Sequence, residues 1–361
     1  MQEVETKDES KTMLNLVQIY RSLAVLSVLI FHGGLVTKGR YGLSPLNDYW
    51  QTGFSGVHFF FVISGFIILT AHHQDLGRKD RLLPYLTKRL VRIYPFYWIV
   101  FMVWGGWRLF SGQLPPIDFL SNAFLFHSKV KHVIPVTWTL AHEMVFYLAF
   151  AIMILAPRTG WPLILLWMAG SAVLDDKPSA VIINPINLEF GLGLLSAYLC
   201  LKLRTKKEEF RNMLGVGLLL AGMVGFAFTN HLVLTDESVF ARWSIHPVTV
   251  WGYGISSACL LMGSLSPWVE RLSKKQRFLL LVGDASYAIY LVHLQFEKSM
   301  ADLLKHMPML WDVNHLNIIS ANIILILVSL TALSLGILIH KWIEKPLIFS
   351  YLRPLTTRIL G

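Results

Sequence analysis

Apolar runs long enough to cross a lipid bilayer recur along almost the whole chain, separated by short polar connections. A spanning helix needs about 20 mostly apolar residues. Ten candidate runs lie near residues 14–36, 54–71, 93–110, 138–156, 161–174, 186–201, 213–229, 245–264, 281–296 and 317–340. Because an α-helix satisfies its backbone hydrogen bonds within one segment, this pattern predicts an all-α, polytopic membrane bundle of about ten transmembrane helices.

Composition agrees with a membrane protein. The 361 residues are 54% hydrophobic and 15% charged, and the mean hydropathy of +0.53 exceeds that of ordinary soluble domains. No small-residue cleavage site follows the first apolar run, so we expect no removable signal peptide. The expected organisation is an N-terminal tail over 1–13, one membrane domain over 14–345 and a C-terminal tail over 346–361. Two isolated cysteines offer no thiolate site, and no metal is expected.

The distribution of basic residues predicts that both termini are cytoplasmic. Of the 32 Lys and Arg residues, 22 lie in the N-terminal tail and the connections on its side of the membrane, whereas 8 lie in the opposite connections. Cationic connections stay in the cytoplasm. The net charge of +10 therefore belongs mainly to a cytoplasmic face that meets anionic lipid, and no nucleic-acid partner is indicated.

The first apolar run carries two residues that a lipid-facing helix would avoid, Arg21 and His32. They are eleven positions apart, which on an α-helix is three turns plus about 20°, so both face one side about 16 Å apart. They could snorkel to opposite interfaces or line an internal cavity. The shared face favours the cavity.

Further imidazoles and carboxylates fall at the predicted external helix ends, near the depth of His32: His58, His142, Glu143 and Glu189. A general base needs an orienting partner for its second ring nitrogen, so we expect Glu143, or else Glu189, to hold the His32 tautomer. Each of these residues could instead be a solvated helix end. His293 lies deep in the ninth predicted span.

A basic segment, Lys88, Arg89 and Arg92, precedes the third predicted span. Arg89 and Arg92 are neighbours on a helix, and paired guanidinium groups suit phosphate oxygens. Anchoring at the cytoplasmic surface explains them equally well.

The second predicted span contains two small residues, Ser64 and Gly65, among bulky ones. They allow either a neighbouring helix or a slender ligand to come close.

Together these features resemble the membrane acyltransferases called acyltransferase family 3, particularly the branch acting in exopolysaccharide synthesis. The matching segments are YRSLAVLSVLIFH, FFFVISGF, KRLVRIYPFYW, WTLAHEMVFY, SYAIYLVH and EKP. The resemblance implies an enzyme of the bacterial inner membrane that moves an acyl group, commonly acetyl from cytoplasmic acetyl-CoA, to a hydroxyl of a polysaccharide or lipid-linked sugar. It implies that Arg21 and His32 are the essential pair and that Arg89 and Arg92 belong to the coenzyme A site. The position of His58 is often acidic in relatives.

The expected mechanism combines the positions of these residues with what the resemblance implies. Lys88, Arg89 and Arg92 hold the phosphates of the donor, and its pantetheine arm passes Arg21, Ser64 and Gly65. His32 acts as a general base on the acceptor hydroxyl or carries the acyl group as a nucleophile. Glu143 orients it, and a second set of residues, His58, Glu189 and His293, supports the site or the acceptor.

Two other classes of protein remain open. A multispanning transporter also uses intramembrane His and Glu residues, although the chain lacks the repeated halves typical of transporters. A non-catalytic subunit of a polysaccharide export complex is the other alternative.

Overall fold

The computed structural model describes residues 2–125, 132–173, 181–306 and 317–352, which form helices and connections without a β-strand among them. The predicted all-α class is therefore confirmed. The chain divides into two compact units, Met1–Ala71 with Leu188–Ile337 and His72–Asn187 with Leu338–Gly361. Residues 353–361 of the predicted C-terminal tail lie outside the described residues.

The first unit contains most of the long helices. They are α1 (Gln2–Tyr41), α2 (Ser55–His72), α8 (Leu188–Leu203), α9 (Glu208–Thr235), α10 (Glu237–Ala241), α11 (Pro247–Met262), α12 (Pro267–Ser273), α13 (Arg277–Asp284), α14 (Ser286–Lys305) and α15 (Ile318–Ile339). Helix α1 begins twelve residues before its predicted start, so the polar tail continues the first span as one helix.

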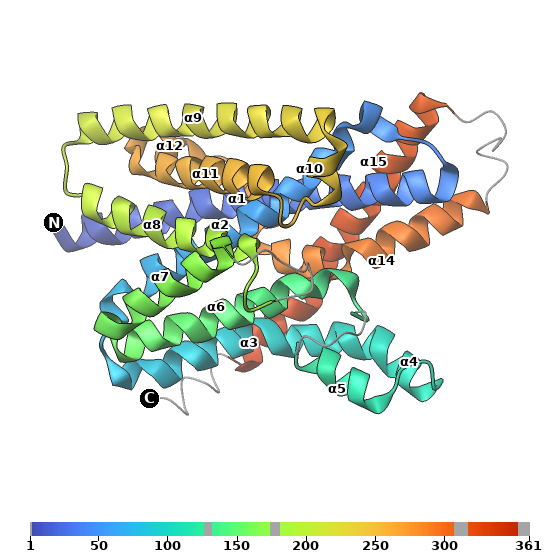
Figure 1. Ribbon diagram of the computed structural model, residues 1–361, viewed down its shortest axis with the longest axis horizontal. Coiled ribbons are helices and arrows are strands. Elements are labelled where there is room, and N and C mark those ends of the chain that lie inside the picture. Colours follow the sequence, from blue (N-terminus) through green and yellow to red (C-terminus); the bar gives the residue numbers. More distant parts are fainter. Residues whose placement is uncertain (1, 126–131, 174–180, 307–316, 353–361) are drawn as a thin grey trace. The chain divides into compact units, whose positions relative to one another are not determined.

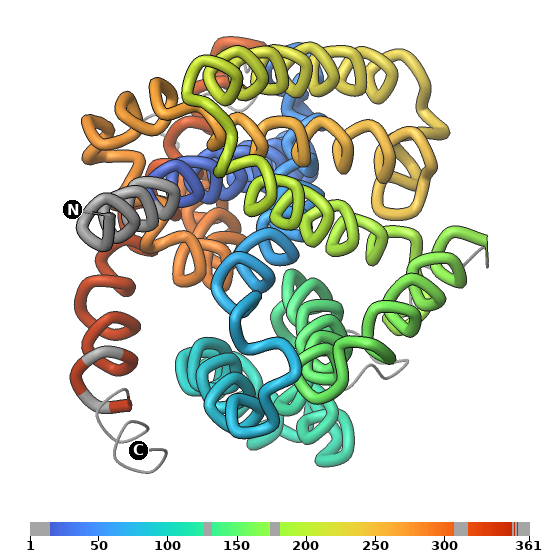
Figure 2. Tube along the Cα trace, turned by 90° about the vertical axis from the view of Figure 1, so that its left-hand side faces the viewer, coloured from blue at the N-terminus to red at the C-terminus, as the bar shows by residue number. Residues whose placement is uncertain are grey.

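Helix α1 packs against α13 and α14, and α9 lies alongside α11 (Figures 1 and 2). Side-chain hydrogen bonds tie these layers together. The Tyr20 hydroxyl donates to the Leu260 carbonyl oxygen at 2.7 Å, which links α1 to α11. The Tyr253 hydroxyl donates to Asn230 Oδ1 at 2.8 Å, which links α11 to α9.

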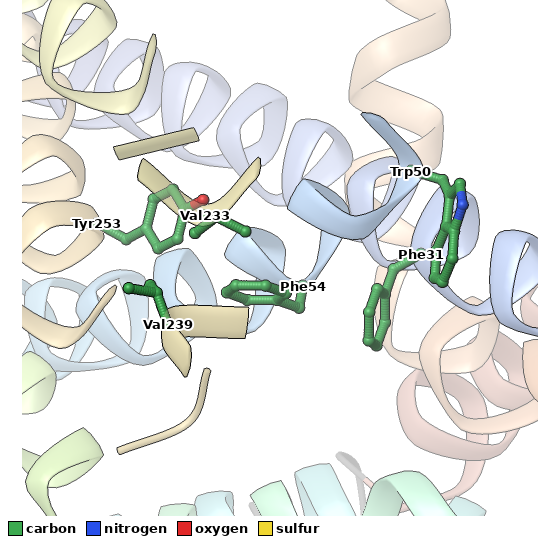
Figure 3. Close-up of a cluster of buried hydrophobic side chains, with 6 residues drawn as sticks. All are labelled: Phe31, Trp50, Phe54, Val233, Val239 and Tyr253. Carbon is green, nitrogen blue, oxygen red and sulfur yellow. The ribbon is translucent and has the colours of Figure 1, made fainter. Parts of the chain in front are cut away.

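An aromatic cluster packs around Phe54 in the first unit. Figure 3 shows the Phe54 ring between the neighbouring rings of Phe31 and Trp50 on one side and the side chains of Val239 and Tyr253 on the other. Phe54 packs edge-on against both Phe31, with ring centroids 5.8 Å apart, and Tyr253, at 5.7 Å. Offset and edge-on ring pairs of this kind add to the stabilisation that burial provides. Because Phe31 precedes His32, the cluster packs against the turn of α1 that carries His32.

The second unit contains α3 (Leu82–Phe101), α4 (Trp107–Phe110), α5 (Pro116–Ala123), α6 (Trp138–Leu155) and α7 (Pro157–Val173). Helix α6 packs against both α3 and α7. The Tyr85 hydroxyl donates to the Tyr147 carbonyl oxygen at 3.1 Å, and the Tyr97 hydroxyl donates to the Asn122 carbonyl oxygen at 2.6 Å. These bonds fix the α3 register against α6 and α5.

Seven helices of the described residues are long and apolar enough to cross a membrane, and α13 with α14, bent by 75°, adds an eighth if the pair forms one span. An integral membrane protein is therefore supported, with fewer clear spans than the ten predicted. Helix α7 has 17 residues and so reaches only about 25 Å, short of a hydrocarbon core of about 30 Å. Helix α3 carries three basic residues within positions 88–92, and its apolar end continues into a π-helical turn at Met102–Gly106.

Candidate active site

Two histidines from distant parts of the chain meet in the first unit. His32 of α1 is half-buried and His293 of α14 is completely buried. The Nε2 atom of His293 lies 3.1 Å from the Nδ1 atom of His32, and the rings meet edge to face with centroids 4.8 Å apart. The two helices run in the same direction, since Arg40 pairs with Asp302 further along them at 2.8 Å. The parallel course of α1 and α14 therefore places the two imidazoles at one level.

The surrounding acceptors determine the tautomers of the two rings. His293 Nδ1 lies 2.6 Å from the Tyr290 carbonyl oxygen, which can only accept, so this nitrogen carries the hydrogen. His32 Nδ1 lies 3.1 Å from the Val28 carbonyl oxygen and therefore also donates. With both rings neutral, His293 Nε2 is then the second acceptor for the His32 Nδ1 hydrogen. The lone pair of His32 is left on Nε2, which no described residue engages.

Arg21 lies on the same uninterrupted helix as His32. Its Nη1 atom donates to Gln18 Oε1 at 3.1 Å, and its side chain is half-buried. The continuous helix confirms that Arg21 and His32 share a face. The catalytic role expected for Arg21 stays a prediction.

His58 and Glu189, two of the residues expected to support the site, form a buried pair. His58 Nδ1 lies 2.5 Å from Glu189 Oε1, and both side chains are completely buried. His58 Nε2 donates to the Trp243 carbonyl oxygen at 3.1 Å. The pair joins α2 and α8 to the turn before α11, with the rings of Trp243 and Tyr253 within 6 Å of the imidazole. Glu189 therefore orients His58, and the alternative expectation that it holds the His32 tautomer is wrong.

Gly65 serves helix packing, which was one of the two alternatives for the small residues of the second span. A Cβ atom on Gly65 would lie 2.2 Å from the Phe190 carbonyl oxygen of α8, and one on Gly193 would lie 2.1 Å from the Val62 carbonyl oxygen of α2. The backbones of α2 and α8 thus cross in direct contact at these two glycines. Ser64 is half-buried beside this crossing, and its role toward a ligand stays a prediction.

In the second unit, Arg89 lies in a network of partners. Its Nη2 atom donates to His72 Nε2 at 2.8 Å, and His72 Nδ1 donates to Asp75 Oδ2 at 2.7 Å. The guanidinium group lies over the rings of Tyr85 and Tyr147, 5.7 and 5.6 Å from their centroids. Burial of the Tyr85 phenol raises its pKa above the usual range, although the nearby Arg89 charge opposes this. Arg89 is therefore held in place by His72 and by the two tyrosine rings.

Arg92 pairs with a carboxylate near the end of the described chain. Its Nη1 atom lies 2.9 Å from Glu344 Oε1, and Glu344 Oε2 accepts from His340 Nδ1 at 2.7 Å. Glu344 is 1% exposed, whereas Arg92 is 32% exposed. Arg92 and His340 thus engage the two oxygens of one buried carboxylate. Lys88, four positions before Arg92, is exposed.

Glu143 lies in α6 of the second unit and accepts a short hydrogen bond from the Tyr147 hydroxyl. His142, its neighbour in sequence, has Nδ1 2.8 Å from Asn187 Oδ1. In the first unit, His32 Nδ1 is engaged by the Val28 carbonyl oxygen and by His293 Nε2. The pairing of Glu143 with His32 stays a prediction.

Sequence reasoning missed residues that engage predicted site residues, among them His72 and Tyr147, and it missed Asp75, which holds His72. Tyr147 had a detectable signal, because it follows Glu143 by four positions and so lies on the same helix face. His72 and Asp75 looked like an ordinary polar helix end. Their link to Arg89 depends on how the chain folds back into α3.

Comparisons with known proteins identify the family of this chain. The family profile described as an acyltransferase domain matches residues 17–341. The "Exopolysaccharide production protein ExoZ" of Rhizobium meliloti (strain 1021) is 29% identical over 263 residues, which cover 68% of this chain and 77% of that protein. No solved structure matches. Since the profile covers most of the chain, including both histidines of the pair, the protein belongs to the membrane-bound acyltransferase family 3.

Proposed function

We propose that this protein transfers an acyl group, acetyl by preference, from cytoplasmic acyl-CoA to a hydroxyl of a polysaccharide or lipid-linked sugar. The family supports acyl transfer, and the printed name of the Rhizobium relative supports an exopolysaccharide acceptor. The apolar helices support a membrane location. We place the protein in the bacterial inner membrane with both termini in the cytoplasm, as the distribution of Lys and Arg indicates.

The observation that carries the proposal is the tautomer of His32. Because Nδ1 donates to Val28 and His293, the free lone pair lies on Nε2. Acting as a base, Nε2 removes the proton of the acceptor hydroxyl. The hydroxyl oxygen at the same time forms the new bond to the thioester carbonyl carbon. The carbon–sulfur bond then breaks, and the proton passes from Nε2 to the sulfur, which yields the ester and the thiol of CoA.

The same geometry also allows a covalent route. In that case Nε2 attacks the thioester carbon and CoA leaves as its thiolate. The acceptor hydroxyl then takes the acyl group from the imidazole, and its proton goes to the thiolate. Both routes need a neutral ring whose other nitrogen is held in place, and His293 with Val28 supplies that hold. The two routes differ in whether labelled acyl protein accumulates without an acceptor.

Donor binding is proposed for the basic residues of the second unit. The guanidinium groups of Arg89 and Arg92 supply charge-assisted donors for phosphate oxygens, and exposed Lys88 adds a third charge. Each arginine is already oriented by a protein partner, so little rotamer freedom is lost when a phosphate binds. Ser64 and Arg21 are proposed contacts of the pantetheine arm.

The test uses the purified full chain in proteoliposomes with radiolabelled acetyl-CoA and an exopolysaccharide acceptor. We expect acceptor-dependent release of CoA and label in the glycan, lost on His32→Ala by about 10²- to 10⁴-fold. Normal turnover by folded His32→Ala protein would remove the proposed role of this histidine. Transport of the glycan without thioester consumption would indicate a transporter, and neither activity would indicate a non-catalytic subunit of an export complex.

A further inference from the structure

Arg89 of the second unit is held by a histidine rather than by a carboxylate. Its Nη2 atom donates to His72 Nε2 at 2.8 Å, and it takes part in no ion pair within the described part of the chain. Arg92, one turn further along α3, instead pairs with the buried carboxylate of Glu344 at 2.9 Å. Guanidinium groups are matched to carboxylates and phosphates, so the histidine leaves the charge of Arg89 without a counter-charge in direct contact.

Asp75 determines which nitrogen of His72 carries the hydrogen. His72 Nδ1 lies 2.7 Å from Asp75 Oδ2, and a carboxylate can only accept, so the hydrogen is on Nδ1. Because Arg89 offers only donors, His72 Nε2 presents its lone pair and the ring is neutral. The three residues therefore form a chain with one direction, in which Arg89 donates to His72 and His72 donates to Asp75.

His72 is also the contact that sets the direction of the Arg89 guanidinium group. The His72 side chain is 7% exposed, and its ring packs edge-on against Tyr85 with centroids 5.0 Å apart. The rings of Tyr85 and Tyr147 attract the cation to their faces. That attraction leaves the guanidinium group free to turn, whereas a hydrogen bond is directional. Without His72, Arg89 would therefore stay near the tyrosines and lose its fixed orientation.

We propose that His72 and Asp75 are positioning residues of the donor site. They fix the direction of the Arg89 guanidinium group through a neutral acceptor and so leave its charge for a phosphate group of acyl-CoA. The inference rests on the proposed binding of the donor by Arg89. It assigns Arg92, whose charge Glu344 offsets, a smaller share of the attraction for phosphate.

The size of the effect follows from the cost of ordering a side chain. Immobilising one rotamer-rich side chain on binding weakens an affinity by about 2- to 10-fold. His72→Ala should therefore raise the KM for acetyl-CoA by about 2- to 10-fold and leave kcat nearly unchanged, since an oriented arginine stabilises bound donor and transition state alike. His72→Gln places a neutral amide oxygen near the position of Nε2 and should keep the KM within about twofold of the unaltered protein.

The role of Asp75 is tested through His72. Asp75→Asn can turn its amide NH2 group toward Nδ1, which lets the hydrogen of His72 move to Nε2 and ends the bond from Arg89. We expect the KM to rise by about 2- to 10-fold, and by less than about twofold when His72→Gln is already present. A loss of packing at Asp75 would raise the KM equally in both backgrounds.

A charged acceptor at position 72 separates positioning from neutralisation. His72→Glu is combined with Asp75→Asn, so that two carboxylates do not meet, and is compared with Asp75→Asn alone. The new carboxylate would form an ion pair with Arg89 and compete with the phosphate for its charge. The KM for acetyl-CoA should then rise by a further tenfold or about that, although Arg89 is again held in place.

Two matched controls account for general effects. His73→Ala removes an exposed histidine next to His72, and Asp80→Asn removes a carboxylate that is 62% exposed and pairs with Arg78 in the same connection. Both should keep the KM of the unaltered protein. All rates are initial rates in proteoliposomes per amount of monodisperse protein, and unfolding temperatures are recorded for every variant.

The outcomes distinguish this inference from the proposed function. An unchanged KM in His72→Ala, a lower kcat at unchanged KM, or a glutamine variant no better than the alanine variant would overturn the inference. In an Arg89→Ala background, His72→Ala should change the KM by less than about twofold, and a full further rise would also overturn it. If Arg89→Ala raises the KM and His72→Ala does not, the inference alone falls. If Arg89→Ala leaves the KM unchanged, the proposed donor site falls as well.

Discussion

The Nε2 atom of His293 lies 3.1 Å from the Nδ1 atom of His32, although the residues are 261 positions apart in the chain. Since His293 donates its other ring hydrogen to the Tyr290 carbonyl oxygen, it presents only an acceptor to His32. In many hydrolases and transferases a carboxylate holds the catalytic histidine. Here a neutral imidazole and a backbone carbonyl oxygen hold His32, the proposed catalytic histidine.

His293→Ala should lower kcat by about 10- to 100-fold, because His32 then has only the Val28 carbonyl oxygen to fix its tautomer. His293→Gln offers an amide oxygen as a replacement acceptor and should retain more activity. The measurement is the initial rate of ester formation with labelled acetyl-CoA in proteoliposomes. Equal rates in the two variants would show that the acceptor atom at position 293 has no effect.

Arg89→Ala should raise the KM for acetyl-CoA by about 10- to 100-fold and change kcat little, because the lost charge-assisted bond to phosphate stabilises the ground state and the transition state alike. The measurement is the dependence of rate on acetyl-CoA concentration. Arg78→Ala removes a charge that lies on the preceding connection and pairs with exposed Asp80, so it is the matched control. A larger KM change at Arg78 would place the donor site elsewhere.

Arg92→Ala should reduce the free energy of unfolding by about 1–3 kcal/mol, since it leaves Glu344, 1% exposed, without its cationic partner. Adding Glu344→Gln to that variant removes the unpaired charge and should recover much of the lost free energy of unfolding. Thermal unfolding in detergent micelles provides the comparison. Additive losses in the double variant would mean that the ion pair contributes nothing to stability.

Gly193→Ala should destabilise the protein by about 1–3 kcal/mol, because the new methyl group would lie 2.1 Å from the Val62 carbonyl oxygen and force α2 and α8 apart. Gly217→Ala in α9 is the control: nothing lies within 4 Å of its Cβ position, and alanine favours a helix. The unfolding temperatures of the two variants should differ clearly. Equal temperatures would contradict the close crossing.

His58→Asp should cost about 3–5 kcal/mol of stability, because it would bring two carboxyl groups together at a completely buried site beside Glu189. Exchanging the two partners, with His58→Glu and Glu189→His in one chain, should recover part of this loss. The yield of monodisperse protein and its unfolding temperature report both effects. A stable single variant would show that position 58 tolerates an acidic residue without compensation.

The described helices agree with the apolar pattern to different degrees. Runs over 54–71, 138–156 and 317–340 match α2, α6 and α15 closely. The ninth run was expected to be one span and is instead bent by 75° between Asp284 and Ser286. A local sequence window does not encode such a bend, which depends on packing against α1.

The sequence by itself determined the helical class and the shared face of Arg21 and His32. Lipid leaves a long apolar segment few ways to satisfy its backbone other than a helix, and the helical pitch then sets which residues align. Only the tertiary structure decided which groups meet: His293 with His32, Glu189 with His58, and α8 with Gly65. Those contacts depend on how helices distant in sequence are aligned, and hydrogen bonds require an alignment accurate to a few tenths of an ångström.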